Sequence, residues 1–375
     1  MTTTTIGISP LITFTPPGER TAPSPAEARG IARDEIRLLV VSADEGGDHV
    51  RHAHFRDLAD HLEPGDLIVV NTSQTVAGEA DARLFDGTDV RDVVVHVAMD
   101  LRDGTWVVEV RTAPDAARAV LDAAPGQMLT LTRAPGASLT LVDPYPRTGS
   151  SPTGEGSRLW RAVHTGDEAL RDVLARVGRP IAYGYLDQRY DLADYQTIFG
   201  TTPGSAEMPS AARPFTPEVV TRLVSRGVGI APVLLHTGVS SQEVGEAPQP
   251  EWFEVGASTA RLVNSTRAGG GRIIAVGTTV TRALESAVAV GSGLVQASSG
   301  WTDRVVTREH PPRVVDGLIT GWHDPQASHL LLVESIAGEQ LAQSAYDAAV
   351  DGGYRWHEFG DSGLFLPSRA AAAAA

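Results

Sequence analysis

The pattern of apolar and polar positions changes twice along the chain. Near the N-terminus, apolar runs at 36–41 and 67–70 lie on either side of a turn at 63–66 and predict two strands. Between about residues 78 and 164, short apolar runs follow one another at even spacing, separated by Gly, Pro and Asp turns. This spacing is typical of a small antiparallel barrel or sandwich. The predicted strands are 93–97, 105–110, 128–132, 138–142 and 159–163, with one predicted helix at 115–123.

After residue 164 the apolar positions take up helical spacing that alternates with strand-like runs. A helix is predicted at 167–177, and a second begins at Thr216-Pro217, where a Thr N-cap precedes Pro at the first helical position. Its apolar residues Val219, Val220, Leu223 and Val224 are expected to face the core. Strands at 230–235 and 272–276 and a helix at 280–290 continue the alternation, which favours an α/β sheet or barrel.

We therefore predict an α/β main domain with a barrel-like mixed sheet and an inserted small antiparallel β-barrel domain. The main domain is expected to comprise residues 1–76 and 164–370, the inserted domain residues 77–163, and the Ala-rich end, 371–375, a tail. Residues 1–30, rich in Thr, Pro, Gly and Ala, are expected to form an extended arm, and 144–156 an exposed loop.

The net charge and the residue types present exclude some kinds of catalytic and binding site. The chain has 46 acidic and 31 basic residues, a net charge of −15, and no cysteine. All basic residues are arginine, so neither a Schiff-base lysine nor a P-loop lysine is possible. The acidic balance counts against binding a polyanion, unless arginines gather locally. With no signal peptide and no apolar run long enough for a membrane span, we expect a cytoplasmic location, and we expect a monomer.

The segment 269–286 carries the most chemical information. A predicted strand runs into Gly277-Thr278-Thr279, after which a helix begins. The start of such a helix offers free backbone N–H groups, and here two hydroxyls, to a polar or anionic ligand group. Arg282 and Glu285 are three positions apart and can share a face of that helix. From spacing alone, a capped helix with a surface ion pair explains the pattern equally well.

This segment resembles the Ala-Val-Gly-Thr-Thr-x-x-Arg-x-Leu-Glu signature of the S-adenosylmethionine:tRNA ribosyltransferase-isomerases of queuosine biosynthesis. Further segments resemble the same family, in the same order, along nearly the whole chain. They are Arg33-Asp34 with Arg37-Leu38-Leu39, Leu62-x-Pro64-Gly65-Asp66 with Asn71-Thr72, Tyr195-Gln196-Thr197, Leu235-His236-x-Gly238, Glu251-Trp252-Phe253-Glu254, Asp316-Gly317-Leu318-Ile319-Thr320 with His323 and Pro325, and Tyr354-Arg355 with Gly360-Asp361.

The resemblance implies a reaction in which the ribosyl unit of S-adenosylmethionine (SAM) moves to a 7-aminomethyl-7-deazaguanine in tRNA, with release of adenine and methionine. SAM is then a substrate, and no metal is implied. Four histidines, His49, His52, His54 and His61, could suggest a metal, but they lie in a polar loop and on a predicted helix without a closed ligand set. We expect no metal site.

Three positions are expected to take part in catalysis: His236, His323 and Glu251. His236 ends a predicted strand, and an imidazole titrates near neutral pH, as a catalytic base or acid must. The aromatic residue next to Glu251, Trp252, would suit a sulfonium or an adenine. The residues expected to bind SAM are Tyr195, Gln196, Thr197, Gly277, Thr278, Thr279, Arg282 and Glu285.

The chain also departs from the family pattern. Pro209-Ser210-Ala211-Ala212-Arg213-Pro214-Phe215 stands where the family has Pro-Thr-Ala-Gly-Leu-His-Phe, and Pro248-Gln249-Pro250 stands where the family has a His-x-Met-His run. These losses leave two alternatives open: a SAM-dependent transferase or lyase that acts on a small molecule, and a binding protein without catalysis.

A tRNA substrate requires arginines that neutralise phosphates. We expect them to gather on one face around the pocket. The candidates are Arg179, Arg189, Arg213, Arg304, Arg308 and Arg313.

Overall fold

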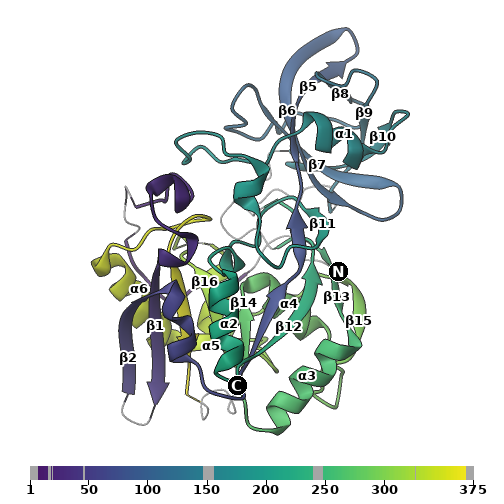
Figure 1. The fold of residues 1–375 in the computed structure, drawn as a ribbon. Helices are drawn as coiled ribbons and strands as arrows, with labels where there is room; N and C mark the ends of the chain where they lie inside the picture. The colour runs from purple at the N-terminus through teal and green to yellow at the C-terminus, as the bar shows by residue number, and fades with distance from the viewer. Residues whose placement is uncertain are drawn as a thin grey trace.

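A computed structural model describes residues 7–15, 18, 20–44, 47–146, 156–239, 248–325 and 327–368. The predicted tail at 371–375 and most of the predicted loop at 144–156 lie outside these residues. The described part has a large mixed sheet with helices and a separate barrel of strands. In Figure 1 the sheet and its helices lie in the lower part of the view and the barrel lies in the upper part.

Nine strands form the mixed sheet. Three adjacent parallel pairs lie at its centre, antiparallel pairs lie on both sides of them, and one further parallel pair lies near one edge. In spatial order they are β15 (Ser298–Thr302), β13 (Glu251–Val255), β12 (Gly229–Leu235), β3 (Leu67–Asn71), β14 (Ile273–Val276), β16 (Gly317–Gly321), β17 (Ser362–Leu366), β1 (Arg37–Asp44) and β2 (Gly47–His54).

Helices cover both faces of this sheet because its strands are apolar on both sides. On β3, Leu67 and Val69 pack in the core with α3 (Ala257–Ala268), α4 (Thr278–Ser286), α5 (His329–Ala337) and α6 (Glu339–Gly352). The alternate residues Ile68 and Val70 pack with α2 (Pro217–Ser225) and a 3-10 helix at Phe55–His61. The period of two along the strand therefore divides the core into two layers.

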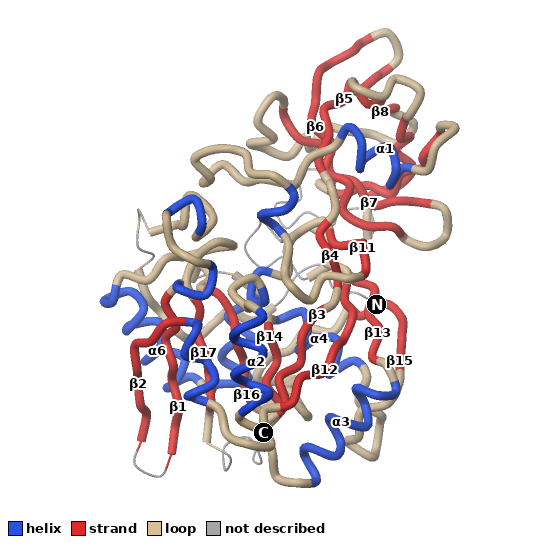
Figure 2. Tube along the Cα trace, viewed as in Figure 1, coloured by secondary structure: helices blue, strands red, loops and turns tan. Residues whose placement is uncertain are grey.

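The second unit is a closed antiparallel barrel with its own apolar core. Its strands, in order around the barrel, are β10 (Leu159–Thr165), β7 (Thr105–Thr112), β6 (Asp89–Asp100), β5 (Glu79–Asp86), β8 (Met128–Leu131) and β9 (Ser138–Pro144). Figure 2 shows this group of strands apart from the helix-covered sheet, with α1 (Leu170–Val177) beside it. A short pair, β4 (Ser73–Thr75) and β11 (Thr202–Ser205), lies between the two units.

The predicted fold class is confirmed: an α/β unit with a mixed sheet accompanies a small antiparallel barrel. The strands of the main sheet nevertheless form an open row from β15 to β2 rather than a barrel-like arrangement. The exact domain boundaries at residues 76 and 163 remain a prediction.

Several predicted elements differ in detail. The helix predicted at 115–123 is wrong, because Val120 donates to the carbonyl of Val110 and Arg111 binds the carbonyls of Ala116 and Ala117, which holds the segment against β7. The helix predicted at 280–290 ends at Ser286. Val224, expected in the core, is 59% exposed.

The N-terminal arm is extended, as expected, but part of it is packed. Backbone N–H groups of Leu11 and Ile12 donate to Glu334 on α5, at 2.6 and 2.8 Å. The ring of Phe14 lies 4.7 Å from that of Tyr346 on α6. The arm therefore covers part of the core.

Ionisable side chains, which we call the barrel cluster, gather on the faces of β5, β6 and β7 that point away from the apolar core of the barrel: Glu79, His96, Glu109 and Arg111, with Arg179 from the segment after α1. Nε2 of His96 lies 3.1 Å from Oε2 of Glu79, and Nδ1 of His96 lies 3.6 Å from Oε2 of Glu109. Arg111 lies 2.6 Å from Glu109, and Arg179 lies 2.6 Å from Glu79. Burial raises the pKa of both carboxyls, but His96 and the arginines overcome this and lower each pKa to about 2.

No helix in the described residues combines the length and the apolar character needed to cross a lipid bilayer.

Candidate active site

A cavity of about 650 Å³ opens beyond the carboxyl ends of β14 and β16. Its wall includes the sheet residues Val276 and Thr320 and, on the barrel side, Arg111, Ala116 and Ala117. Small-molecule sites occupy roughly 300–1,000 Å³ and favour the carboxyl ends of strands in α/β sheets. The position and size of this cavity therefore suit a ligand such as a nucleoside.

The first turn of α4 forms one part of the wall. Gly277 has φ of 91°, which favours glycine, and allows the chain to turn from β14 into α4. Thr278 and Thr279 follow, both in the cavity wall, and the N-cap residue, Gly277, has no side chain that could cap the backbone N–H groups of this turn. The structure thus places the predicted Gly-Thr-Thr segment where its donors face the cavity.

Arg282 and Glu251 meet on the same wall. The guanidinium forms an ion pair with Glu251 and also donates to the carbonyl oxygens of Gln249, Thr302 and Arg304, at 3.0 to 3.1 Å. The other carboxylate oxygen of Glu251 accepts from the backbone N–H of Gly238 at 3.0 Å. The pair joins α4, β13 and the loop after β12, so it braces the wall.

His323, which follows β16, also lies in the cavity wall. Its ring stacks on His329 with centroids 4.6 Å apart, and its Nε2 lies 3.1 Å from the hydroxyl of Thr320. Burial, with further effects of His329 and His357, keeps the pKa of His323 well below its ordinary value. The imidazole is therefore neutral at neutral pH, with one ring nitrogen that carries no proton, and the same burial makes it a weaker base than a free imidazole.

A group of aromatic and acidic side chains closes another part of the wall. Tyr185 stacks between Tyr183 and His357, with centroids 6.0 and 4.9 Å away. The hydroxyl of Tyr183 donates to Glu207, and that of Tyr185 donates to Glu358 at 2.9 Å. All five residues line the cavity.

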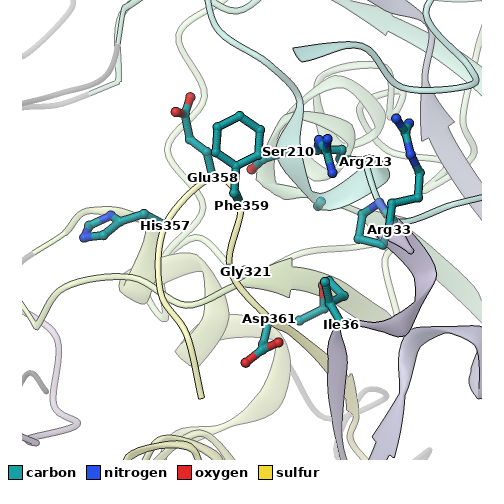
Figure 3. Close-up of a pocket in the computed structure, with 13 residues that line it drawn as sticks. Arg33, Ile36, Ser210, Arg213, Gly321, His357, Glu358, Phe359 and Asp361 are labelled. Atoms are coloured by element: carbon teal, nitrogen blue, oxygen red, sulfur yellow. The ribbon is translucent and has the colours of Figure 1, made fainter. Parts of the chain in front are cut away.

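Glu358 is the member of this group whose pKa is shifted to near neutral pH. Burial, and then the charge of Glu207, raise its pKa to about 8, against the lowering effect of the Tyr185 hydrogen bond. Figure 3 shows Glu358 beside a small adjoining pocket, with its carboxylate pointing away from Asp361. Its carboxyl group is therefore mostly protonated at neutral pH.

Sequence reasoning missed Glu207, Glu358, Tyr183 and Tyr185. The available signal was their position: Glu207 lies two residues before the segment 209–215 that departs from the family pattern, and Glu358 lies between the Tyr354-Arg355 and Gly360-Asp361 matches. An isolated glutamate gives no further indication that the fold will bury it.

His236 lies behind the wall, to which its neighbours Thr237 and Gly238 contribute. Its Nδ1 is 2.8 Å from the hydroxyl of Ser73. A Cβ atom at Gly204 would lie only 2.4 Å from the ring, so glycine is required there. Burial, together with Arg102 and Arg171, lowers the pKa of His236 to about 4.

The polar triplet Tyr195-Gln196-Thr197 lies outside the cavity wall. Tyr195 is buried against Phe359, with ring centroids 5.2 Å apart. The amide of Gln196 donates to the carbonyls of Thr75 and Leu192. The triplet thus packs beneath the turn that carries Glu358.

Glu285 is also outside the wall, although Arg282 lies in it. Its carboxylate accepts from the backbone N–H groups of Arg313, Val314 and Val315, at 2.9 to 3.2 Å. It fixes the segment that leads into β16, and Arg282 pairs with Glu251 instead of with Glu285.

Each of the six candidate phosphate-binding arginines lies within 4.0 Å of a carboxylate. Arg179 and Arg189 contact Glu79, while Arg304 and Arg313 face Glu285. Arg213 contacts Glu27 and is buried, and Arg308 lies 4.0 Å from Glu334. Their charges are thus partly offset within the protein.

Among the described residues, no three His, Asp or Glu side chains come together as metal ligands would.

Comparison with known proteins identifies the family. Residues 11–365 match the family model described as queuosine biosynthesis protein. An S-adenosylmethionine:tRNA ribosyltransferase-isomerase from Heliobacterium modesticaldum is 34% identical over 361 residues, with 93% of this chain and 97% of the relative covered. The enzyme of the same name from Thermosynechococcus vestitus is 33% identical, with 94% of each chain covered.

Among solved structures, a crystal structure of an S-adenosylmethionine tRNA ribosyltransferase from Thermotoga maritima is similar, with 26% identity, a TM-score of 0.49, and 94% of this chain and 99% of that chain covered. The residues matched by the family model include the barrel strands and every segment that lines the cavity. The chain therefore belongs to the S-adenosylmethionine:tRNA ribosyltransferase-isomerase family of queuosine biosynthesis.

Proposed function

We propose that this protein transfers the ribosyl unit of SAM to a 7-aminomethyl-7-deazaguanine in tRNA and rearranges it, with release of adenine and methionine. The observation that carries the proposal is the 650 Å³ cavity, whose wall brings together the family segment Gly277-Thr278-Thr279 with Glu251 and His323. These residues come from separate parts of the chain and face one ligand-sized space.

The start of α4 is the proposed site for the carboxylate of SAM. Backbone N–H groups and the positive end of a helix dipole favour an anionic group, and the hydroxyls of Thr278 and Thr279 add two donors. The ion pair between Arg282 and Glu251 holds this turn against β13 and the loop after β12. In this proposal Arg282 acts by keeping the wall in place.

His323 is the proposed base. The sulfonium of SAM makes its neighbouring 5′ carbon acidic, so a neutral imidazole close to that carbon can remove a proton. The hydroxyl of Thr320 and the stacked ring of His329 orient His323 in the cavity wall.

Five residues expected to act directly are proposed to act from behind the wall. His236 supports Thr237 and Gly238, while Glu285 fixes the approach to β16. Tyr195, Gln196 and Thr197 support the turn at residues 356–360, through the contact between Tyr195 and Phe359.

The proposed tRNA contact rests on the partly exposed arginines. The side chains of Arg189, Arg308 and Arg313 are 43%, 40% and 39% exposed, whereas that of Arg213 is 4% exposed and unsuited to phosphate. Phosphates would have to compete with the carboxylates now beside these arginines. Binding should therefore weaken steeply as salt is raised, because each neutralised phosphate releases counterions.

The direct test combines the protein with SAM and with tRNA that carries the deazaguanine. We expect free adenine, free methionine and a heavier modified nucleoside in the digested tRNA. Adenine without any change in the tRNA would indicate a small-molecule acceptor, and SAM binding without adenine would indicate a binding protein. Either result would overturn the proposal.

A pair of variants tests the SAM site. Thr279→Val removes a hydroxyl from the cavity wall with little change in shape, and we expect it to weaken SAM binding about 5- to 20-fold in calorimetry. Thr221→Val on α2 removes a hydroxyl that binds the carbonyl of Pro217 outside the cavity, and serves as the matched control. Equal affinity in both variants would argue against this site.

A further inference from the structure

Glu358 lies on a turn whose backbone is held in an uncommon conformation. The preceding residue, His357, has φ of 68°, in the left-handed region that non-glycine residues seldom adopt. The turn is anchored at both ends: Trp356 pairs with the backbone of Arg20 and Ala22, and Arg29 donates to the carbonyl of Phe359. Such backbone strain persists where the surroundings enforce it, and it is concentrated at functional sites.

The hydrogen-bond partner of Glu358 is a neutral phenol, and its neighbour in charge is another acid. Tyr185 donates to its Oε2 at 2.9 Å, and the carboxylate of Glu207, itself bound by Tyr183, raises its pKa. Two nearby carboxyl groups in a cavity wall do not both ionise readily, so one of them keeps a proton. This arrangement resembles that of groups which give up a proton during catalysis.

The titratable groups around Glu358 come from several segments. On the cavity side they are Tyr183, Tyr185, Glu207 and His357, with Asp324 near His357. Behind the turn they are Tyr195, Arg33 and Arg213.

We propose that Glu358 is the acid that gives its proton to adenine as adenine leaves SAM, and that Glu207 is a positioning residue that acts through Glu358. This inference rests on the SAM chemistry proposed above. It goes further by naming a proton donor that the family segments do not contain.

The proton balance of the step is complete. After the base has removed the 5′ proton and the ribose ring has opened, the ring oxygen forms a carbonyl with the ribosyl carbon as the bond from that carbon to the adenine nitrogen breaks. The electron pair of the broken bond stays on adenine, and the proton of Glu358 forms the new N–H bond. When the acceptor amine bonds to the ribosyl unit, its nitrogen loses a proton, which the Glu358 carboxylate takes up. The acid is thereby restored without an additional reagent.

The first experiment measures adenine release from SAM in the presence of the tRNA acceptor. Glu358→Gln keeps the shape but carries no transferable proton, and we expect its rate to fall about 10²- to 10⁴-fold. SAM affinity in calorimetry should stay within about threefold of the wild type. The control is Glu254→Gln, on the exposed side of β13, with an unchanged rate expected.

The second experiment is the pH profile of adenine release, which a purely structural role would not move. The wild-type rate should fall above about pH 8, where Glu358 loses its proton. Glu207→Gln removes the neighbouring charge, so the pKa of Glu358 falls and this decline should begin at lower pH. A wild-type rate in Glu358→Gln, or an unmoved decline in Glu207→Gln, would overturn the inference.

A third measurement separates this inference from the proposed function. Infrared spectra of the wild type minus Glu358→Gln should contain the band of a protonated carboxyl group, which disappears as pH rises through about 8. Absence of that band overturns the inference even if tRNA is modified. If the band is present but tRNA is not modified and adenine is not released, the proposed function fails, and the catalytic role of Glu358 fails with it.

Discussion

The pKa values of carboxyl groups at two places in this molecule are shifted in opposite directions. In the barrel cluster, Glu79 and Glu109 lie beside His96 and arginines, and each pKa is lowered to about 2. In the cavity, Glu358 lies beside Glu207 and two tyrosines, and its pKa is raised to about 8. Burial alone would raise all three pKa values, so the neighbouring charges decide the sign.

The comparison distinguishes a structural use of acids from a chemical one. A carboxylate surrounded by cations holds its charge and joins strands, as Glu109 on β7 contacts His96 on β6. A carboxyl group beside another acid keeps a proton that it can exchange near neutral pH.

The largest expected effect comes from the barrel cluster. Glu109→Ala removes the carboxylate that faces His96 and Arg111, and should lower the free energy of unfolding by about 3–5 kcal/mol. Urea denaturation measures this change. Glu168→Ala, which breaks the exposed pair with Arg176, should cost at most about 1 kcal/mol. Similar losses in the two variants would contradict a special role for the cluster.

Glu358 should show the opposite linkage between stability and pH. Because its pKa is raised from 4.5 to about 8, the wild type gains stability from this group below pH 4.5 and loses it as pH rises to 8. Glutamine does not titrate, so the comparison is the unfolding free energy of the wild type minus that of Glu358→Gln. This difference should fall by about 2–4 kcal/mol over this pH range. The figure corresponds to roughly 1.4 kcal/mol for each pKa unit, reduced for screening by solvent. If this difference in unfolding free energy did not change with pH, Glu358 would not differ from the barrel carboxylates in the way described above.

The barrel should respond at acid pH instead. The pKa of Glu79 is lowered from 4.5 to about 2, so its stabilisation is present above pH 4.5 and is lost as pH falls to 2. The difference in unfolding free energy between the wild type and Glu79→Gln should therefore shrink by about 2–3 kcal/mol between these values. Denaturant titrations at several pH values measure it, and a difference that grows on acidification would reverse the assignment.

The smallest effects distinguish two tyrosines near the cavity. Tyr185→Phe removes a hydrogen bond that lowers the pKa of Glu358, so the alkaline decline of adenine release should move upward by about half a pH unit. The buried hydroxyl of Tyr195 has no hydrogen-bond partner among the described residues. Tyr195→Phe should therefore change stability by less than about 0.5 kcal/mol and leave the decline in place.

Much of the fold could be predicted because local patterns decide it. Short apolar runs predicted β1, β3 and the barrel strands other than β5, and Thr216 does cap α2, accepting from the N–H of Val219. The helix predicted at 115–123 failed because the side chain of Arg111 binds carbonyls of that segment, a contact that helical spacing does not reveal.

The site was only partly accessible from sequence. The segment Gly277 to Arg282 lies in the cavity wall because a strand-to-helix turn exposes its donors locally. The pair Glu207 and Glu358 could not be predicted, since it depends on bringing distant segments to one wall. For the same reason, spacing suggested Arg282 with Glu285, whereas tertiary packing pairs Arg282 with Glu251.

The cavity wall that the barrel and the sheet share also affects how cooperatively the two units unfold. The barrel and the sheet have separate apolar cores, yet residues from both line one cavity. A ligand that fills it adds binding free energy only to the state in which both cores are folded and docked. Saturating SAM should therefore merge the melting of the barrel with that of the sheet into a single transition at higher temperature.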